Sequence, residues 1–94
     1  MPRVQFDWDA HKAALNESDH GVSFDEAKEV FYDPNQVIEY DLEHSSNEDR
    51  YRIIGRSRWR LLMVVYTERP GEIIRLISAR EAGKRQRRIY EEQT

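Results

Sequence analysis

The arginines near the C-terminus are the residues best suited to chemistry on an anion. In "EIIRLIS", residues 72–78, the alternation of a strand places Arg75 among apolar neighbours on one face. A guanidinium there needs a partner, because an unpaired buried charge is costly. The partner is one of two kinds. It is either a carboxylate, such as that of Glu48 or Glu68 in a structural salt bridge, or a phosphate, which arginine binds through two parallel hydrogen bonds.

A second basic group follows in the segment expected to form the last helix. "SARE" matches a capping box, with Ser78 as N-cap and Glu81 three positions later, and predicts a helix over 79–92 that starts with Arg80 close to Arg75. Spacings of three and four make one stripe of cations with an aromatic ring beside it: Arg80, Lys84, Arg87, Arg88 and Tyr90. This stripe suits a nucleic-acid backbone with one stacked base, or else a solvated helix whose arginines pair with acidic residues elsewhere.

Motifs for other chemistries are missing from the sequence. The chain has no cysteine, and its histidines, His11, His20 and His44, do not show a metal-binding spacing. We therefore expect no metal. His20 precedes Gly21 at the end of a predicted helix, where the helix dipole favours a charged imidazole, so it is either a cap or a proton carrier.

Charge is distributed unevenly along the 94 residues. Residues 1–47 contain 3 Lys/Arg and 11 Asp/Glu, and residues 48–94 contain 12 and 7. A basic half suggests a surface for an anionic partner, although a charge-balanced fold with solvated acidic helices gives the same counts. The length predicts one domain over 1–94. The N-terminus lacks a signal-peptide core and no apolar run reaches the roughly 18 residues of a membrane span, so a cytoplasmic protein is expected.

Periodicity predicts an α+β domain in which a small antiparallel sheet is packed by helices. We expect helices at 10–20, from Ser23 to before Asp33, and at 79–92. Five segments have strand character: "VQFDW", "QVIEYD", "RYRIIGRS", "RLLMVVYT" and "IIRLIS", the last two joined by the turn "RPGE". The expected order, β-α-α-β-β-β-α, contains four strands, one fewer than these segments. "RLLMVVYT" is apolar on both faces and should be central, with its second face covered by the final helix, a second copy or another protein.

Four blocks in order resemble the BrnT family of toxins. "FDWDAHKAALNESDHGVSFDEAKEVFYDP" resembles the family's opening, with F-x-W-D, H-G-V-S-F and E-A. "EDRYRIIG", "LLMVVYTER" and "IIRLISAREAGKRQRRIYEE" resemble the later blocks, so the likeness covers about residues 6–92.

The resemblance implies a RelE-like fold and a ribonuclease toxin of a type II toxin–antitoxin module. Such a toxin would cut RNA without a metal and slow translation and growth. It would be neutralised by a BrnA-type antitoxin. The toxin would form a homodimer, or a 2:2 complex with the antitoxin. Operator DNA would be contacted only indirectly, through the antitoxin. The alternative is a non-catalytic interaction module that binds an antitoxin or nucleic acid through its basic C-terminal helix.

The resemblance also proposes roles for individual residues in an attack of the ribose 2′-OH on phosphorus. Arg75 and Arg80 would neutralise the phosphate oxygens, with Arg50 or Arg69 in support. Candidates for proton transfer are Glu48, His20 and Tyr90, and the sequence does not rank them. Glu48 and Arg50 match the family's E-x-R step, and Arg69 belongs to its T-x-R step.

The sequence departs from the family at two places. Ser18 and Asp19 stand where basic residues usually precede H-G-V, and Gln86 stands where a glutamate is common in the last helix. The first change removes positive charge near His20. It predicts weaker activity or a different specificity, and it argues against a catalytic role for His20.

Overall fold

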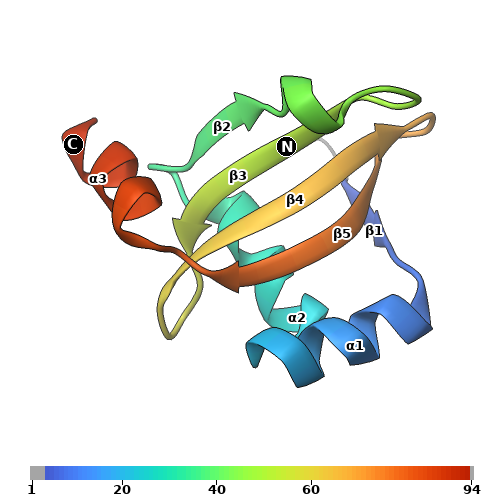
Figure 1. Ribbon diagram of the computed structural model, residues 1–94, viewed down its shortest axis with the longest axis horizontal. Coiled ribbons are helices and arrows are strands. Elements are labelled where there is room, and N and C mark those ends of the chain that lie inside the picture. The colour runs from blue at the N-terminus through green and yellow to red at the C-terminus, as the bar shows by residue number, and fades with distance from the viewer. Residues whose placement is uncertain (1–3, 94) are drawn as a thin grey trace.

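The computed structural model describes residues 4–93 as one sheet with helices packed on it (Figure 1). The strands are β1 (Gln5–Asp7), β2 (Val37–Tyr40), β3 (Arg50–Arg56), β4 (Leu61–Arg69) and β5 (Ile73–Glu81). The helices are α1 (Ala10–His20), α2 (Phe24–Ala27) and α3 (Lys84–Glu92), with 3-10 turns at η1 (Lys28–Tyr32) and η2 (Leu42–His44). The α+β class is confirmed. None of these helices is long and apolar enough to span a membrane.

The sheet has the strand order β1-β5-β4-β3-β2. β4 is the middle strand, as its apolar residues on both faces predict. Neighbours from β2 to β5 are antiparallel, but β1 runs parallel to β5. The expected antiparallel sheet is therefore wrong for β1, and the expected order is one strand short. No hairpin joins β1 to β5, so no turn in the sequence sets the direction of this pair.

Local signals at the helix ends act as expected. The Asp9 side chain accepts the backbone N–H of Lys12 at 2.9 Å, and Ser23 Oγ accepts that of Glu26 at 3.1 Å. Gly21 ends α1 with φ 70°, a left-handed conformation that glycine adopts without a Cβ penalty. The second helix tightens into η1 after Ala27 and ends before the Asp33–Pro34 step.

The predicted start of the last helix is wrong. Ser78 to Glu81 continue β5, and Arg80 pairs with Met63 while Glu81 pairs with Leu62. α3 begins only at Lys84, where the side chain of Gln86 accepts the backbone N–H of Gly83 at 3.1 Å. Pairing with the long apolar β4 outweighs the capping pattern of "SARE", because that pattern reports only local preference.

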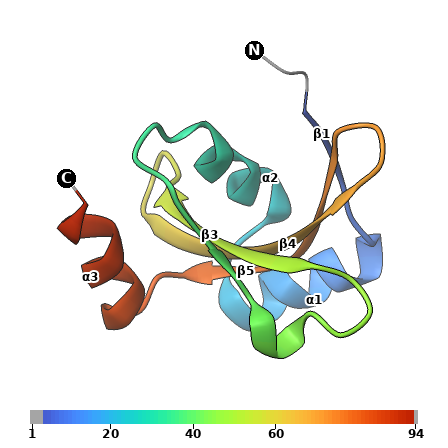
Figure 2. The same cartoon turned by 90° about the horizontal axis from the view of Figure 1, so that it is seen from above.

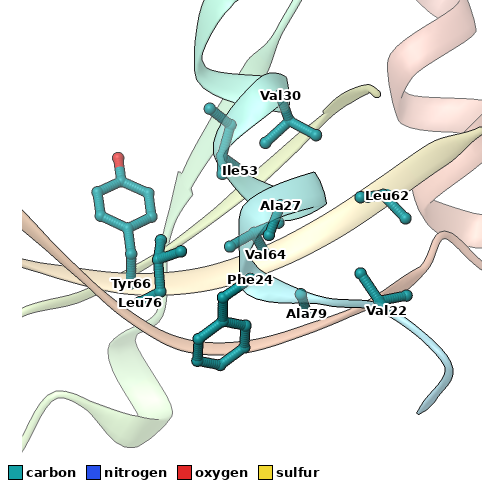
Figure 3. Close-up of a cluster of buried hydrophobic side chains, with 10 residues drawn as sticks. All are labelled: Val22, Phe24, Ala27, Val30, Ile53, Leu62, Val64, Tyr66, Leu76 and Ala79. Carbon is teal, nitrogen blue, oxygen red and sulfur yellow. The ribbon is translucent and has the colours of Figure 1, made fainter. Parts of the chain in front are cut away.

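The main core lies between one face of the sheet and the first two helices. Figure 3 shows Phe24 and Ala27 of α2 beside Val64 of β4 and Leu76 of β5. Tyr66 belongs to the same cluster and stacks on Tyr51 with ring centroids 5.4 Å apart. Burial of these side chains removes apolar area from water and fixes which face of each strand points inward.

A smaller core on the other face is covered by α3. It joins Ile54, Leu61 and Met63 of the sheet to Ala82 and Tyr90. Both views show α3 standing apart from α1 and α2 (Figure 1, Figure 2). The final helix, one of the three expected covers for the second apolar face, packs on part of it, and the described chain leaves the rest of this face open.

An extra residue in β5 changes the facing of the strand's second half. Val65 pairs with Ser78 while Tyr66 pairs with Leu76, so Ile77 has no partner of its own on β4 and forms a β-bulge. Before the bulge, Leu76 points into the main core. After it, Ala79 does. The bulge therefore shifts the alternation of inward-facing and outward-facing side chains by one residue.

Candidate active site on the open sheet face

The open part of the second face carries two hollows, which we together call the arginine groove. The first, about 320 Å³, is lined by Asp41, His44, Arg50, Arg52, Met63, Val65, Ile77, Ser78, Arg80, Arg85 and Gln86. The second, about 180 Å³, is lined by Asp9, Lys12, Glu48, Arg50, Thr67, Arg69, Arg75, Leu76 and Ile77. Arg50 and Ile77 line both hollows, which makes them neighbouring parts of one surface.

Strand register explains how the basic residues gather in this groove. Arg50 of β3 pairs with Thr67 of β4, which pairs with Arg75 of β5. Residues directly opposite on neighbouring strands share a face, so these three side chains point the same way. Without the bulge at Ile77, Arg80 would point toward the main core.

Arg75 is held by a carboxylate other than those expected. Its Nη1 lies 2.6 Å from Oδ2 of Asp7, the residue that pairs with it in the parallel β1–β5 register. Glu48 and Glu68 were the expected partners, and neither forms this bridge. The side chains of Arg75 and Asp7 are 29% and 49% exposed, so solvent screens the pair and leaves Arg75 accessible from the groove.

Glu48 lies between two arginines of the second hollow. Its carboxylate oxygens are 3.5 Å from Nη2 of Arg50 and 3.8 Å from Nη2 of Arg69. A carboxylate in this position orders both guanidinium groups. It also stands where a phosphate oxygen would otherwise sit between them.

Arg80 and Arg85 are the free cations of the first hollow. Both are exposed, and within residues 4–93 neither has a carboxylate within 4 Å. Their charge is therefore available to an anionic ligand. Arg80 was expected close to Arg75, but five residues of strand at roughly 3.3 Å per residue separate their Cα atoms by about 16 Å.

A chain of charged groups closes the other side of the first hollow. Arg52 lies 3.3 Å from the buried Asp41 and 3.5 Å from Glu39, and Asp41 contacts His44. Three buried atoms here have no hydrogen-bond partner: Oε1 of Glu39, Nε of Arg52 and Nε of Arg50. The Arg52–Glu39 contact is thus an ion pair without hydrogen-bond geometry. Both Nε atoms are buried and face the protein, so a ligand in the hollow would meet the Nη atoms of these guanidinium groups.

The other predicted site residues lie away from the groove. His20 is exposed at the end of α1 and lines neither hollow. Lys84, Arg87 and Arg88 are on α3 as expected, and they too are outside the lining. The expected stripe is incomplete, because Arg80 belongs to β5.

Tyr90 is buried in the smaller core, with 4% of its surface exposed. Its hydroxyl donates to Oδ2 of Asp33 at 2.6 Å, and the guanidinium of Arg56 lies 5.4 Å from the ring centroid. Burial and the Asp33 hydrogen bond raise the pKa of Tyr90. The ring has no open side for a stacked base in this structure.

Four charged or titratable residues that line the first hollow were missed by the sequence reasoning: Asp41, His44, Arg52 and Arg85. One signal was present, since the alternation of "RYRII" places Arg52 on the face of Arg50. The other three come from a loop and a helix whose approach to the sheet is not encoded in local periodicity.

Two other features of the molecule bear on its chemistry. No three His, Asp or Glu side chains among residues 4–93 are placed to hold a metal ion. A larger cavity, about 540 Å³, lies on the helix side beside Trp59, and its carboxylates Glu26, Glu29 and Asp25 are already paired with Arg60, Arg58 and Lys28. The arginine groove has guanidinium groups without carboxylate partners, so it is better suited than this cavity to bind an anionic ligand.

The fold and groove define a small α+β protein with an arginine-lined sheet face suited to a phosphate-bearing ligand. The family model for BrnT, the ribonuclease toxin of a type II toxin–antitoxin system, matches residues 8–86. The chain therefore belongs to the BrnT family of ribonuclease toxins. A crystal structure of the Brucella abortus ribonuclease toxin BrnT is similar in fold, with a TM-score of 0.68 and 19% identity over 87% of this chain and 100% of that chain. No curated protein matches the sequence.

Proposed function

We propose that this toxin is an endoribonuclease that binds single-stranded RNA in the arginine groove and cleaves it without a metal ion. The ribose 2′-OH attacks the adjacent phosphorus and the bond to the 5′-oxygen breaks. Arginines supply the positive charge that the phosphate oxygens need in the transition state. The proposal is supported above all by Arg80, an exposed guanidinium beside an open hollow with no carboxylate partner in the described chain.

The groove suggests a division of labour among the arginines. Arg80 and Arg50 would contact the scissile phosphate, because they line the first hollow. Arg75 and Arg69 would hold a neighbouring phosphate in the second hollow, where each already contacts a carboxylate. RNA binding there requires phosphate to compete with Asp7 and Glu48, which makes the second hollow the weaker of the two.

The cellular role that follows is inhibition of translation and growth in the cytoplasm. A BrnA-type antitoxin would neutralise the toxin, in a dimer or a 2:2 complex. The overall architecture would be of the RelE type. These points rest on membership of the family, and the groove adds one expectation: an antitoxin that neutralises by occlusion should bring carboxylates to Arg80 and Arg85.

Cleavage of a labelled RNA by the purified protein in excess EDTA tests this function. Wild-type protein should cleave, and Arg80→Ala and Arg75→Ala should lose cleavage while circular dichroism and thermal unfolding remain those of a folded protein. Arg58→Ala is the matched control, because Arg58 is an exposed arginine on the other side of the molecule, paired with Glu29. Cleavage that disappears with EDTA and returns with added metal would contradict the metal-free mechanism.

A second candidate function is a non-catalytic binding module. It is favoured by the exposed cations of α3, Lys84, Arg85 and Arg88, none of which has a carboxylate within 4 Å in residues 4–93. This function predicts intact RNA and normal growth on expression, together with tight capture of an acidic protein partner. Substituting these three residues together should then abolish capture.

A further inference from the structure

His44 is a titratable side chain in the first hollow with no role in the mechanism so far. It is the last residue of η2, and its side chain is 60% exposed. Its Nδ1 lies 3.1 and 3.0 Å from the two carboxylate oxygens of Asp41. We propose that His44 is the catalytic residue that removes the 2′-OH proton, with Asp41 as its positioning residue. The proposal rests on the proposed RNA cleavage.

Asp41 assigns the tautomer of the imidazole. The Asp41 carboxylate is 7% exposed and lies 3.3 Å from Nη1 of Arg52, which keeps it beside a permanent positive charge. An ionised carboxylate only accepts hydrogen bonds, so the contact requires the proton on Nδ1 of His44. In the neutral ring, Nε2 then carries the lone pair and is the atom able to take a proton.

The loop that carries His44 is tied to the start of β3. The backbone N–H of Asp41 donates to the carbonyl of Arg50 at 2.8 Å. The hydroxyl of Ser45 donates to the Asp41 carbonyl and accepts the backbone N–H of Arg50 at 2.9 Å. These bonds fix the backbone of the loop against the start of β3, beside Arg50, which lines the same hollow as His44.

The charged groups around this hollow come from four elements. Asp41 and His44 belong to the β2–β3 connection, Arg50 and Arg52 to β3, Arg80 to β5 and Arg85 to α3. A phosphate held by the arginines would have its adjacent ribose within the same hollow. The positive charge that the imidazole gains on taking a proton is offset by the Asp41 carboxylate against its other side.

The cleavage reaction consumes no reactant besides the RNA, and solvent water only exchanges protons. The 2′-oxygen forms a bond to phosphorus as its proton passes to Nε2 of His44. The bond from phosphorus to the 5′-oxygen breaks, and the departing oxygen takes a proton from water. The products are a 2′,3′-cyclic phosphate and a 5′-hydroxyl, and His44 returns its proton to solvent.

Other candidates for the base are less well placed. Glu48 is occupied by two arginines, Tyr90 is buried, and His20 lines neither hollow. A purely structural role for His44, as a pin that holds the loop to Asp41, is the competing explanation. Glutamine at this position separates the two, because its amide donates to Asp41 as the imidazole does but accepts no proton.

The decisive experiment compares His44→Gln with His11→Gln in the full chain. His11 is an exposed histidine on α1 that lines neither hollow, so it is a matched control. Single-turnover cleavage is measured across pH, and affinity is measured with an oligonucleotide that carries 2′-deoxyribose at the cleavage site. His44→Gln should slow cleavage by about 10²–10⁴-fold and keep affinity, with the wild-type acid limb of the pH profile lost. His11→Gln should match the wild-type protein.

Further variants separate a catalytic role of His44 from a structural one. Free imidazole should restore part of the cleavage by His44→Ala, which a structural pin would not explain. Asp41→Asn should reduce cleavage and alter the pH profile, whereas Arg52→Gln should weaken binding instead. Full activity of His44→Gln, or loss of activity in His20→Gln alone, overturns the role of His44. Absence of cleavage by the wild-type protein overturns the proposed function with it.

Discussion

Arg75 and Arg80 share one face of β5 although five positions separate them. Strict alternation would put them on opposite faces, and the unpaired Ile77 restores a common facing. Arg75 pairs across the sheet with Thr67, and Arg80 pairs with Met63. One extra residue therefore converts a strand with a single arginine on its open face into one with an arginine in each hollow.

The ion pair between Asp7 and Arg75 predicts that the carboxylate opposes RNA binding. Asp7→Asn frees the guanidinium and should raise affinity for a non-cleavable single strand by up to about fivefold, which corresponds to the ~1 kcal/mol upper range of an exposed pair. Arg80→Gln should lower affinity and reduce the slope of log affinity against log salt by about 0.7. Fluorescence anisotropy at several salt concentrations measures both changes.

The matched control for these binding variants is Arg58→Gln, on the far side of the molecule from the groove. It should leave both the affinity and the salt slope unchanged. If Arg58→Gln weakens binding as much as Arg80→Gln does, then net charge and not the groove sets the affinity.

The ion pair of the buried Glu26 with the partly buried Arg60 predicts loss of stability in acid. Glu26 accepts hydrogen bonds from Arg60 at 2.7 and 2.9 Å and from Ser57 at 2.7 Å. Arg60, with help from Ser57, lowers the pKa of Glu26 from its ordinary value of 4.5. A depressed pKa means that the stabilisation is complete above the unfolded value and is lost as pH falls through the folded value.

Glu26→Gln should therefore lower the free energy of unfolding at neutral pH by about 3 kcal/mol, because Arg60 is left partly buried without its charge partner. It should also flatten the dependence of stability on pH below about 4.5. Urea denaturation across pH measures both effects. Glu29→Gln, which breaks an exposed pair with Arg58, should cost less than about 1 kcal/mol. Equal losses in the two variants would contradict this assignment.

Tyr66 should ionise well above the ordinary tyrosine pKa of 10. Burial in the main core, with smaller contributions from Glu68 and Tyr51, raises its pKa to about 12. The unfolded chain ionises near 10, so stability is complete below pH 10 and declines toward pH 12. Ultraviolet titration of phenolate should show a late step that disappears in Tyr66→Phe. A late step retained by that variant would place the high pKa elsewhere.

Removing the side chain of Asn16 should cause a large loss of stability, although the side chain is small. It is 7% exposed, and its Nδ2 donates to the carbonyls of Val22 at 3.0 Å and Ala79 at 2.8 Å. Its Oδ1 accepts the backbone N–H of Ala79 at 3.0 Å. Asn16→Ala should lower the free energy of unfolding by about 2–3 kcal/mol, because buried backbone groups lose their partners. Asn47→Ala, in an exposed loop, should change it by less than about 0.5 kcal/mol in the same urea measurement.

Local features of the sequence predicted much of the fold. Asp9, Ser23 and Gly21 mark helix ends through bonds within a few residues of themselves, and these expectations are confirmed. The apolar run of β4 predicted a central strand, and its turn into β5 formed as expected. Such signals are readable because their causes are local or depend only on hydrophobic period.

The remaining features depend on contacts between distant segments. The parallel pairing of β1 with β5 gives Arg75 its partner Asp7, which lies 68 positions earlier in the chain. The "SARE" pattern failed because pairing with β4 decides the state of Ser78 to Glu81. Arg75, Arg80, Arg50, Arg69 and Glu48 were named from sequence and do lie in the groove. The bulge, the loop of His44 and the approach of α3 have no local signature.

The side-chain amide of Asn16 also protects part of the sheet edge from pairing with another molecule. β1 pairs with β5 only from Ile73 to Arg75, so in the described chain the outer edge of β5 beyond that point has no strand beside it. An open edge invites another chain to add a strand and begin an aggregate. At Ala79 both backbone groups are already taken by Asn16, with α1 lying alongside. The other border of the sheet is β2, where Ile38 and Tyr40 are exposed and this protection by Asn16 does not reach.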